Sequence, residues 1–198
     1  MKLLFPEFRA YLSERILADS VDKICEISSP FTFEPDKPFV KQGEVSGFLF
    51  FLNDGITRHY VVNQAGQEAN KTFTPAPCIV GSTRALVTQL PSGINLTTLK
   101  PARGIKIAWR EFRELMEQHH DIEKFYRLGL EKLFIMKEER ESSFLLESAE
   151  ERYREFLRSH KSLLSEIPQY HVASYLGINP VSLSRIRKQI SCSDENTA

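Results

Sequence analysis

The stretch from Gln169 to Lys188, QYHVASYLGINPVSLSRIRK, decides how the C-terminal part of the chain folds. Its apolar residues stand where two short crossing helices would share one core: Val172, Leu176, Ile178, Leu183 and Ile186. Gly177 lies between them, and a residue without Cβ adopts the left-handed conformation of a helix end most easily. Asn179 can cap the next helix, and Pro180 suits its first turn, where a missing N–H costs nothing. The stretch therefore predicts two helices joined by a turn of about three residues, the helix-turn-helix arrangement.

The second of these helices is predicted to turn a polar and basic face away from the shared core. Hydroxyls and amides near a helix N-terminus suit phosphate oxygens, and Arg185 carries the donor fork that matches guanine O6 and N7. The same pattern is open to a second interpretation, a structural helical hairpin with a solvated basic face. The residues predicted to contact double-stranded DNA are Asn179, Pro180, Val181, Ser182, Ser184, Arg185 and Lys188.

The charge of the chain supports a nucleic-acid partner through its distribution. The 26 basic and 26 acidic residues give a formal net charge of zero. Between Ser148 and Gln189, however, there are seven basic residues and four acidic ones. From Pro168 to Gln189 there are three basic residues and no acidic one, which is the asymmetry that a phosphate-facing surface requires.

Upstream of this stretch, Ser148-Ala-Glu-Glu151 has the form of a capping box, in which the serine hydroxyl accepts from the Glu151 amide and the Glu151 side chain reaches back. A helix is expected to begin here, so residues 147–198 are predicted to form the DNA-binding domain and residues 1–146 the domain before it. Because the sequence has no β-hairpin pattern after Ile190, the wing of this winged-helix-like domain is expected to be reduced or absent. The tail Ser191–Ala198 is predicted to be disordered.

A long helix is expected between the two domains. Glycine and proline are rare beyond Trp109, and Asp121–Leu146 is predicted to be one helix of about 39 Å. Apolar residues on more than one side indicate two partners, the chain's own β domain and the same helix of a second subunit. The alternative is a helix buried wholly within one subunit. The predicted dimerisation residues follow a near-heptad seam: Ile122, Phe125, Tyr126, Leu133 and Met136.

The N-terminal part is predicted to be mainly β structure. Ser28–Ala108 holds most of the glycines and prolines, with short apolar or alternating runs between turn signals. Asp54-Gly55 predicts a tight type I′ turn, and a second turn is expected at Asn63–Gly66. With an apolar-faced helix expected at Phe5–Leu17, the fold class is α+β, with an antiparallel, jelly-roll-like β-roll as the N-terminal domain. Strands are expected at 39–41, 48–52, 56–62, 69–73, 95–99 and 104–108.

With these parts in place, the chain resembles the Crp/Fnr family of bacterial transcription regulators. The resemblance is strongest in four segments: Glu151-Arg-Tyr153, Ile167-Pro-Gln169, Ala173-Ser-Tyr-Leu-Gly177 and Leu183-Ser-Arg-Ile-Arg187. It implies a sensor roll of the cyclic-nucleotide-binding type, a dimerisation helix, a palindromic operator, and RNA polymerase as a partner. It also implies that Arg185 is the principal base-reading arginine. Pro180 and Val181 stand where the family commonly has charged base-reading residues, so its operator consensus does not carry over.

The sensor half departs from the nucleotide-binding members of that family. The resemblance places the effector pocket at Gly81, Ser82, Ser92 and Gly93, where those members carry a glutamate for the ribose and an Arg-Ser or Arg-Thr pair for the cyclic phosphate. Without a cation at Ser92, a buried phosphate would lack its charge partner. Control by cyclic AMP is therefore not expected, whereas an unidentified small-molecule effector, or no effector, is left open.

Other functional classes find little support in the sequence. Nothing resembles a nucleophile with its base, a phosphate-binding loop or a carboxylate pair, so no enzyme activity, cofactor or metal is expected. Cys25, Cys78 and Cys192 are far apart, Pro6 interrupts the apolar start, and no run reaches membrane-spanning length. A cytoplasmic protein without membrane contact is expected. The alternatives are an effector- or protein-binding sensor that has lost DNA binding and, more distantly, a cupin-type enzyme, although His59 is the only histidine in the roll region.

Overall fold

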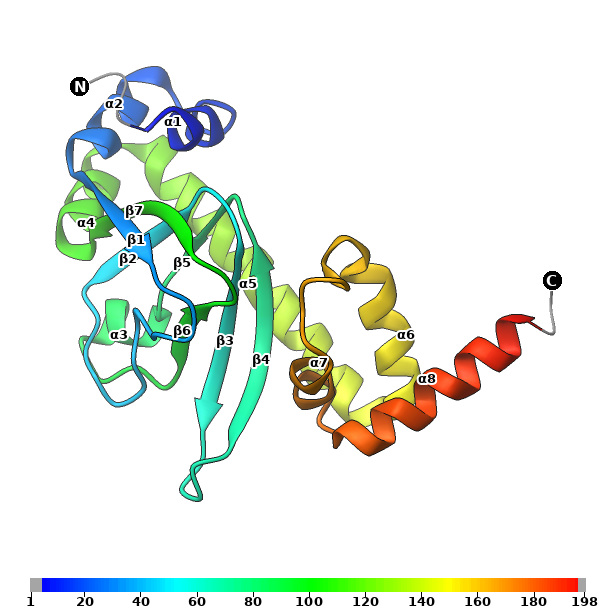
Figure 1. The fold of residues 1–198 in the computed structure, drawn as a ribbon. Coiled ribbons are helices and arrows are strands. Elements are labelled where there is room, and N and C mark those ends of the chain that lie inside the picture. Colours follow the sequence, from blue (N-terminus) through cyan, green and yellow to red (C-terminus); the bar gives the residue numbers. More distant parts are fainter. Residues whose placement is uncertain (1–4, 196–198) are drawn as a thin grey trace.

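The computed structural model describes residues 5–195 as a β-roll with helices at one end, a long helix, and a helical head (Figure 1). The helices are α1 (Pro6–Ser13), α2 (Ala18–Glu26), α3 (Thr83–Thr88), α4 (Trp109–Gln118), α5 (His120–Leu146), α6 (Ala149–Ser159), the short 3-10 helix η1 (Lys161–Leu163), α7 (Gln169–Leu176) and α8 (Pro180–Glu195). The strands are β1 (Ser28–Phe33), β2 (Phe48–Leu52), β3 (Ile56–Val62), β4 (Glu68–Pro75), β5 (Cys78–Val80), β6 (Asn95–Thr98) and β7 (Ala102–Ala108). No helix within residues 5–195 combines the length and apolar character needed to cross a membrane. The predicted order of roll, long helix and helix-turn-helix is confirmed.

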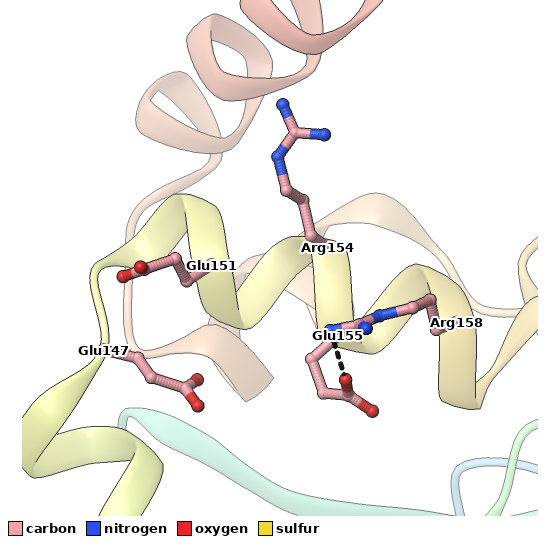
Figure 2. Close-up of a pocket in the computed structure, with 5 residues that line it drawn as sticks. All are labelled: Glu147, Glu151, Arg154, Glu155 and Arg158. Carbon is pink, nitrogen blue, oxygen red and sulfur yellow. Dashed lines mark ion pairs between the residues drawn. The ribbon is translucent and has the colours of Figure 1, made fainter.

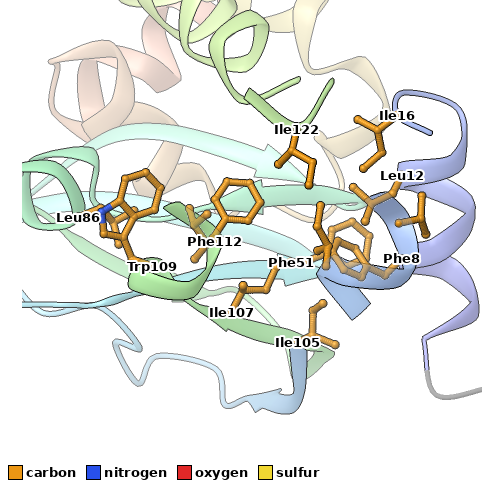
Figure 3. Close-up of a cluster of buried hydrophobic side chains, with 13 residues drawn as sticks. Phe8, Leu12, Ile16, Phe51, Leu86, Ile105, Ile107, Trp109, Phe112 and Ile122 are labelled. Atoms are coloured by element: carbon orange, nitrogen blue, oxygen red, sulfur yellow. The ribbon is translucent and has the colours of Figure 1, made fainter. Parts of the chain in front are cut away.

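Two antiparallel sheets form the roll. The larger sheet has the strand order β1-β7-β2-β5 and the smaller has the order β4-β3-β6. Strand β2 is a continuous apolar run because both of its faces are covered. Phe51 packs in a cluster with α1, α2 and α4 (Figure 3), and Leu49 belongs to the same cluster. Phe50 and Leu52 pack on the other face, between the two sheets.

The two predicted turns have different outcomes. At Asn63–Gly66 the prediction is confirmed, because the Gly66 amide donates to the Asn63 carbonyl at 3.0 Å and β3 pairs with β4. At Asp54-Gly55 the type I′ hairpin is wrong. Only Gly55 has a positive φ, of 83°, and the flanking strands β2 and β3 lie in different sheets. The turn passes the chain from one sheet to the other because β2, apolar on both faces, pairs with β5 and β7 instead.

Three local predictions are corrected. The strand expected at 39–41 is reduced to a single bridge between Val40 and Leu96. The helix expected at Phe5–Leu17 ends at Ser13, and a second helix, α2, follows it. The disorder expected from Ser191 is also wrong as far as Glu195, because α8 continues to that residue, without a glycine or proline to end it. The rest of that tail, 196–198, lies outside the described residues.

The long helix α5 belongs partly to the roll. Ile122 is completely buried in the cluster that α1, α2 and α4 share (Figure 3). Phe125 and Tyr126 pack against the same cluster. Ile122 is therefore a core residue of its own subunit, and its predicted dimer contact is corrected. Leu133 is half-buried and Met136 is exposed. The exposed apolar residues of α5 are Leu128, Phe134, Ile135, Met136, Phe144, Leu145 and Leu146.

The head, formed by α6 to α8, has its own core and begins at the predicted capping box. The Ser148 hydroxyl accepts from the Glu151 amide at 3.2 Å, and the Glu151 carboxylate accepts from the Ser148 amide at 2.7 Å. The head core also includes two residues of the roll. Its buried members are Ile56, Phe73, Tyr153, Phe156, Leu163, Ile167, Val172, Ala173, Leu176, Leu183 and Ile190.

The head packs directly on strand β4 through α7. The rings of Phe73 on β4 and Tyr175 on α7 have their centroids 5.8 Å apart. Beside them, the Asn70 side-chain amide donates to the His171 carbonyl at 3.0 Å and lies 3.1 Å from His171 Nδ1. We call this contact between β4 and α7 the head–roll junction. It places the helix-turn-helix in one orientation relative to the roll.

Two histidines are held in their neutral form. Burial, together with the nearby Lys137 and Lys71, lowers the pKa of His59 on β3 to about 4. Burial also lowers the pKa of His171 in the head–roll junction to about 4, with Arg58 contributing in the same direction. Both imidazoles resist protonation because a buried cation beside other cations is unfavourable.

The stability of the protein is expected to fall as the pH drops from about 6.5 towards about 4. In this window the unfolded chain takes up protons that the two folded imidazoles exclude, so each histidine can cost up to about 3 kcal/mol. Urea unfolding at about pH 7, 6 and 5 measures this slope. His171→Gln should flatten it, whereas His120→Gln, at an exposed position, should not. Equal slopes for wild type and His171→Gln would contradict the assignment.

Candidate nucleic-acid interface

The turn between α7 and α8 is built as the sequence predicts. Gly177 adopts the left-handed conformation with a φ of 71°, and the Ile178 amide donates back to the Ala173 carbonyl at 3.1 Å. Asn179 Oδ1 accepts from the Ser182 amide at 2.8 Å, so it caps α8. The turn therefore fixes α8 against α7, and the orientation of one helix determines that of the other.

Helix α8 has a buried face and an exposed face. Leu183 and Ile190 are buried in the head core. At 3.6 residues per turn, successive residues lie about 100° apart around the axis, so the opposite face points away from the head. Val181 is 62% exposed on that side. We call this exposed set the outward face of α8: Val181, Ser184, Arg185 and Lys188.

The other predicted DNA contacts lie beside this face. Asn179 is exposed, but its side-chain oxygen is used in capping. Pro180 is exposed at the helix start, and Ser182 is half-buried on the flank. The structure thus brings all seven residues to the first three turns of one helix and separates a structural member, Asn179, from the four that point outwards.

The two cationic side chains of the outward face are not neutralised by carboxylates in the described part of the chain. Within residues 5–195, Arg185 and Lys188 make no ion pair. Helix α6 is different: Arg154 pairs with Glu150 at 3.0 Å, and Arg158 pairs with Glu155 at 2.7 Å. These pairs neutralise the α6 surface, so the basic surplus of the head is concentrated on α8.

A shallow pocket on α6 illustrates this neutralisation (Figure 2). Figure 2 shows the carboxylate of Glu155 paired with Arg158. Its lining consists of Glu147, Glu151, Arg154, Glu155 and Arg158. Three carboxylates and two guanidinium groups present no net positive charge to a phosphate backbone, which excludes this pocket as a phosphate-binding surface of the head.

The predicted effector pocket is occupied by its own loops. The Ser82 hydroxyl accepts from the Ala85 amide and caps α3. The Ser92 hydroxyl lies 2.7 Å from the Ile94 carbonyl, and the Ser92 backbone bonds to Glu44 and Gly43. Both hydroxyls are buried, whereas Gly81 and Gly93 flank them in the same loops. Binding of an effector at these four residues stays a prediction.

Aromatic rings occupy the space between the two sheets next to these loops. The ring centroids of Phe31 and Phe50 are 5.1 Å apart, and those of Phe33 and Phe39 are 4.8 Å apart. Edge-to-face packing of this kind fills space without leaving a polar wall. Among the described residues, no group of three or more His, Cys, Asp or Glu is placed to hold a metal ion.

Three residues that hold α7 in place are not among those predicted from the sequence. Asn70, Arg140 and Arg152 all bond to α7 or to its C-terminal end. One signal was present: Asn70 is a polar residue at an inward position of a strand, and such a residue needs a buried partner. Arg140 and Arg152 read as ordinary surface residues of helices, so their contacts had no local signal.

Comparison with known proteins finds similarity in structure alone. No protein-family model and no curated protein sequence matches the chain. FixK2 from Bradyrhizobium japonicum superposes with a TM-score of 0.72 and 14% identity, covering 85% of this chain and 86% of the other. The c-di-GMP responsive global regulator CLP of Xanthomonas campestris gives 0.72 and 13%, covering 90% and 93%.

A further similar structure is a transcriptional regulator of the Crp/Fnr family from Eubacterium rectale, with a TM-score of 0.71 and 13% identity, covering 92% of this chain and 87% of the other. All three superpositions extend over the roll, the long helix and the head. Structural similarity at sequence identities this low is evidence for a shared fold only. The chain therefore has the fold of the Crp/Fnr transcriptional regulators.

Proposed function

We propose that the chain is a bacterial sequence-specific DNA-binding transcriptional regulator that acts as a homodimer on a palindromic operator. The observation that carries this proposal is the outward face of α8. It combines short side chains at the start of a helix with two unpaired cations, on a helix that is held by a helix-turn-helix core. The major groove of DNA admits such a helix, and its phosphates supply the missing anions. The partners of the chain are then DNA, a second copy and RNA polymerase.

Each residue of the outward face has a chemical role in this proposal. Arg185 donates both arms of its guanidinium group to guanine O6 and N7, and Val181 contacts a thymine methyl group. Ser184 and Lys188 bond to phosphate oxygens, which set the position of the helix in the groove. Two-fold symmetry places the two half-sites about 34 Å apart, one helical turn of DNA.

The dimer contact is proposed on the face of α5 that the roll leaves uncovered. Leu128 and Ile135 are seven residues apart, so they share one side of the helix, and they are 49% and 52% exposed. Phe134 and Leu145 extend this apolar surface along one flank. Because Ile122 and its neighbours are covered by the roll, one side of α5 can pack in the core of its own subunit while the other side contacts a second subunit. Of the predicted seam, Met136 lies beside this surface, about 100° around the helix from Ile135, and stays a candidate, whereas Leu133 lies on the side of Ile122.

Arg185→Ala is expected to weaken binding by about 5- to 150-fold, or about 1 to 3 kcal/mol, and to relax one base position. The measurement is fluorescence anisotropy with the duplex that the wild type enriches from a random library. The matched control is Arg187→Ala, because this exposed residue lies about 200° around α8 from Arg185. Unchanged sequence preference in Arg185→Ala would remove its assigned role, and a wild type that enriches no duplex would contradict the proposed function.

Ile135→Glu is expected to convert the dimer to a monomer, because two carboxylates would face each other across an apolar contact. Sedimentation equilibrium measures the change in mass. Lys137→Glu is the control, since it reverses a charge on the same turn about 200° around the helix. A monomeric wild type, or a dimer that survives Ile135→Glu, would refute this face of α5 as the dimer contact.

Cyclic AMP is expected to bind no more tightly than about 1 mM by titration calorimetry. Ser92 supplies no cation for the cyclic phosphate, and the nearby Arg84 donates to the Pro91 carbonyl at 2.8 Å on the surface. Ser92→Arg, which restores a cation to the loop, is a comparison variant. A dissociation constant of about 1 µM for the wild type would overturn the expectation.

A further inference from the structure

We infer that Asn70, a residue of the β-roll, is a positioning residue for DNA recognition: it fixes the orientation of α8 through the hydrogen bonds that it makes to α7. The inference rests on the proposed function. It assigns a role in recognition to a residue that lies outside the helix-turn-helix, on strand β4, and that does not belong to the outward face of α8.

Every polar group on the inner side of Asn70 is used in the head–roll junction. Its side-chain nitrogen bonds to His171, and its backbone amide donates to Ser174 Oγ at 3.0 Å. Its side-chain oxygen accepts from Arg58 Nη1 at 3.0 Å, and the same guanidinium nitrogen is held by Glu68 at 2.6 Å. Asn70 thus joins α7 to a buried network that is anchored in the roll.

Helix α5 holds α7 from another direction. Arg140 donates to the Tyr175 carbonyl at 2.7 Å, and its guanidinium group lies 3.9 Å from the centre of the Tyr175 ring. Hydrogen bonds depend on direction, so bonds from both β4 and α5 restrict rotation of α7 as well as its position. A head attached by the chain connection at Glu147 alone would have no such restriction.

The docked orientation is compatible with DNA binding. The outward face of α8 is exposed while α7 is seated on β4. The junction therefore covers part of α7 and leaves the outward face of α8 accessible to DNA. Leu183 of α8 packs in one core with Val172 and Leu176 of α7, so the two helices move together. The junction therefore pre-orients α8 and does not block it. In a dimer, two docked heads define one distance and one angle between the recognition helices.

A positioning role and a purely structural role differ in one measurable property, the tolerance for half-site spacing. Inserting one base pair between half-sites moves them by about 3.4 Å and turns them by about 35°. Two fixed heads cannot follow this change, whereas two loosened heads can. Loss of general stability would instead weaken binding to all spacings by the same factor.

The test compares wild type, Asn70→Leu and Thr72→Val on duplexes whose half-sites are separated by the selected spacing, or by one or two base pairs more or less. Leucine has the branched shape of asparagine, with two methyl groups in place of the amide oxygen and nitrogen, and its side chain forms no hydrogen bond. Thr72→Val is the control on the same strand, two residues away. Wild type and Thr72→Val should prefer the selected spacing by about tenfold or more. Asn70→Leu should reduce this preference to about twofold, with unchanged base preference within each half-site.

Ser174→Ala provides a second variant, because it removes the acceptor of the Asn70 backbone amide, together with the donor to the Glu68 carbonyl, and leaves the Asn70 side chain in place. It should lower the spacing preference to an intermediate value, and it keeps the test valid where Asn70→Leu fails to fold. If folded Asn70→Leu, or Ser174→Ala in its place, retains the full spacing preference of the wild type, the inference is overturned while the proposed function stands. If the wild type binds none of the duplexes, the proposed function fails and the inference falls with it.

Discussion

A buried amide on a β-strand, Asn70, forms directional hydrogen bonds that join the roll to the head. A buried polar group without a partner costs about 1 to 3 kcal/mol, and the Asn70 side-chain nitrogen has its partner on His171 only when α7 is seated on β4. Apolar packing of Phe73 against Tyr175 adds area at the same place but specifies direction less strictly. The orientation of the head follows from the hydrogen bonds, and the direction in which α8 faces follows from the orientation of the head.

The distribution of charge explains how a chain with no net charge can present a cationic surface. On α6, acidic and basic residues alternate at helical spacing and pair with one another, as Arg154 does with Glu150. On α8 there is no acid from Pro180 to Gln189, and in the described part of the chain Arg185 and Lys188 form no ion pair. The net charge of the chain does not show this difference between α6 and α8. It becomes apparent only when the ion-pair partner of each charged side chain is considered.

The parts that the sequence predicts well are those fixed by residues close along the chain. The capping box at Ser148 and the turn at Gly177 and Asn179 each depend on contacts within about four residues, so their patterns are visible without a fold. The assignment of faces depends on distant partners. Strands β2 and β3 are adjacent in sequence but lie in different sheets, and Ile122 faces α1 and α2 instead of a second subunit. Nothing within a few residues of these positions distinguishes the alternatives.

The most direct test of this account is a structure of the full chain bound to a duplex that it selects. The account predicts a dimer with α8 in the major groove of each half-site, Arg185 against a guanine, and α7 still seated on β4 with Asn70 bonded to His171. A complex in which DNA contacts another surface would contradict the reading role of α8. A complex in which the head has left β4 would contradict the claim that the roll sets its orientation.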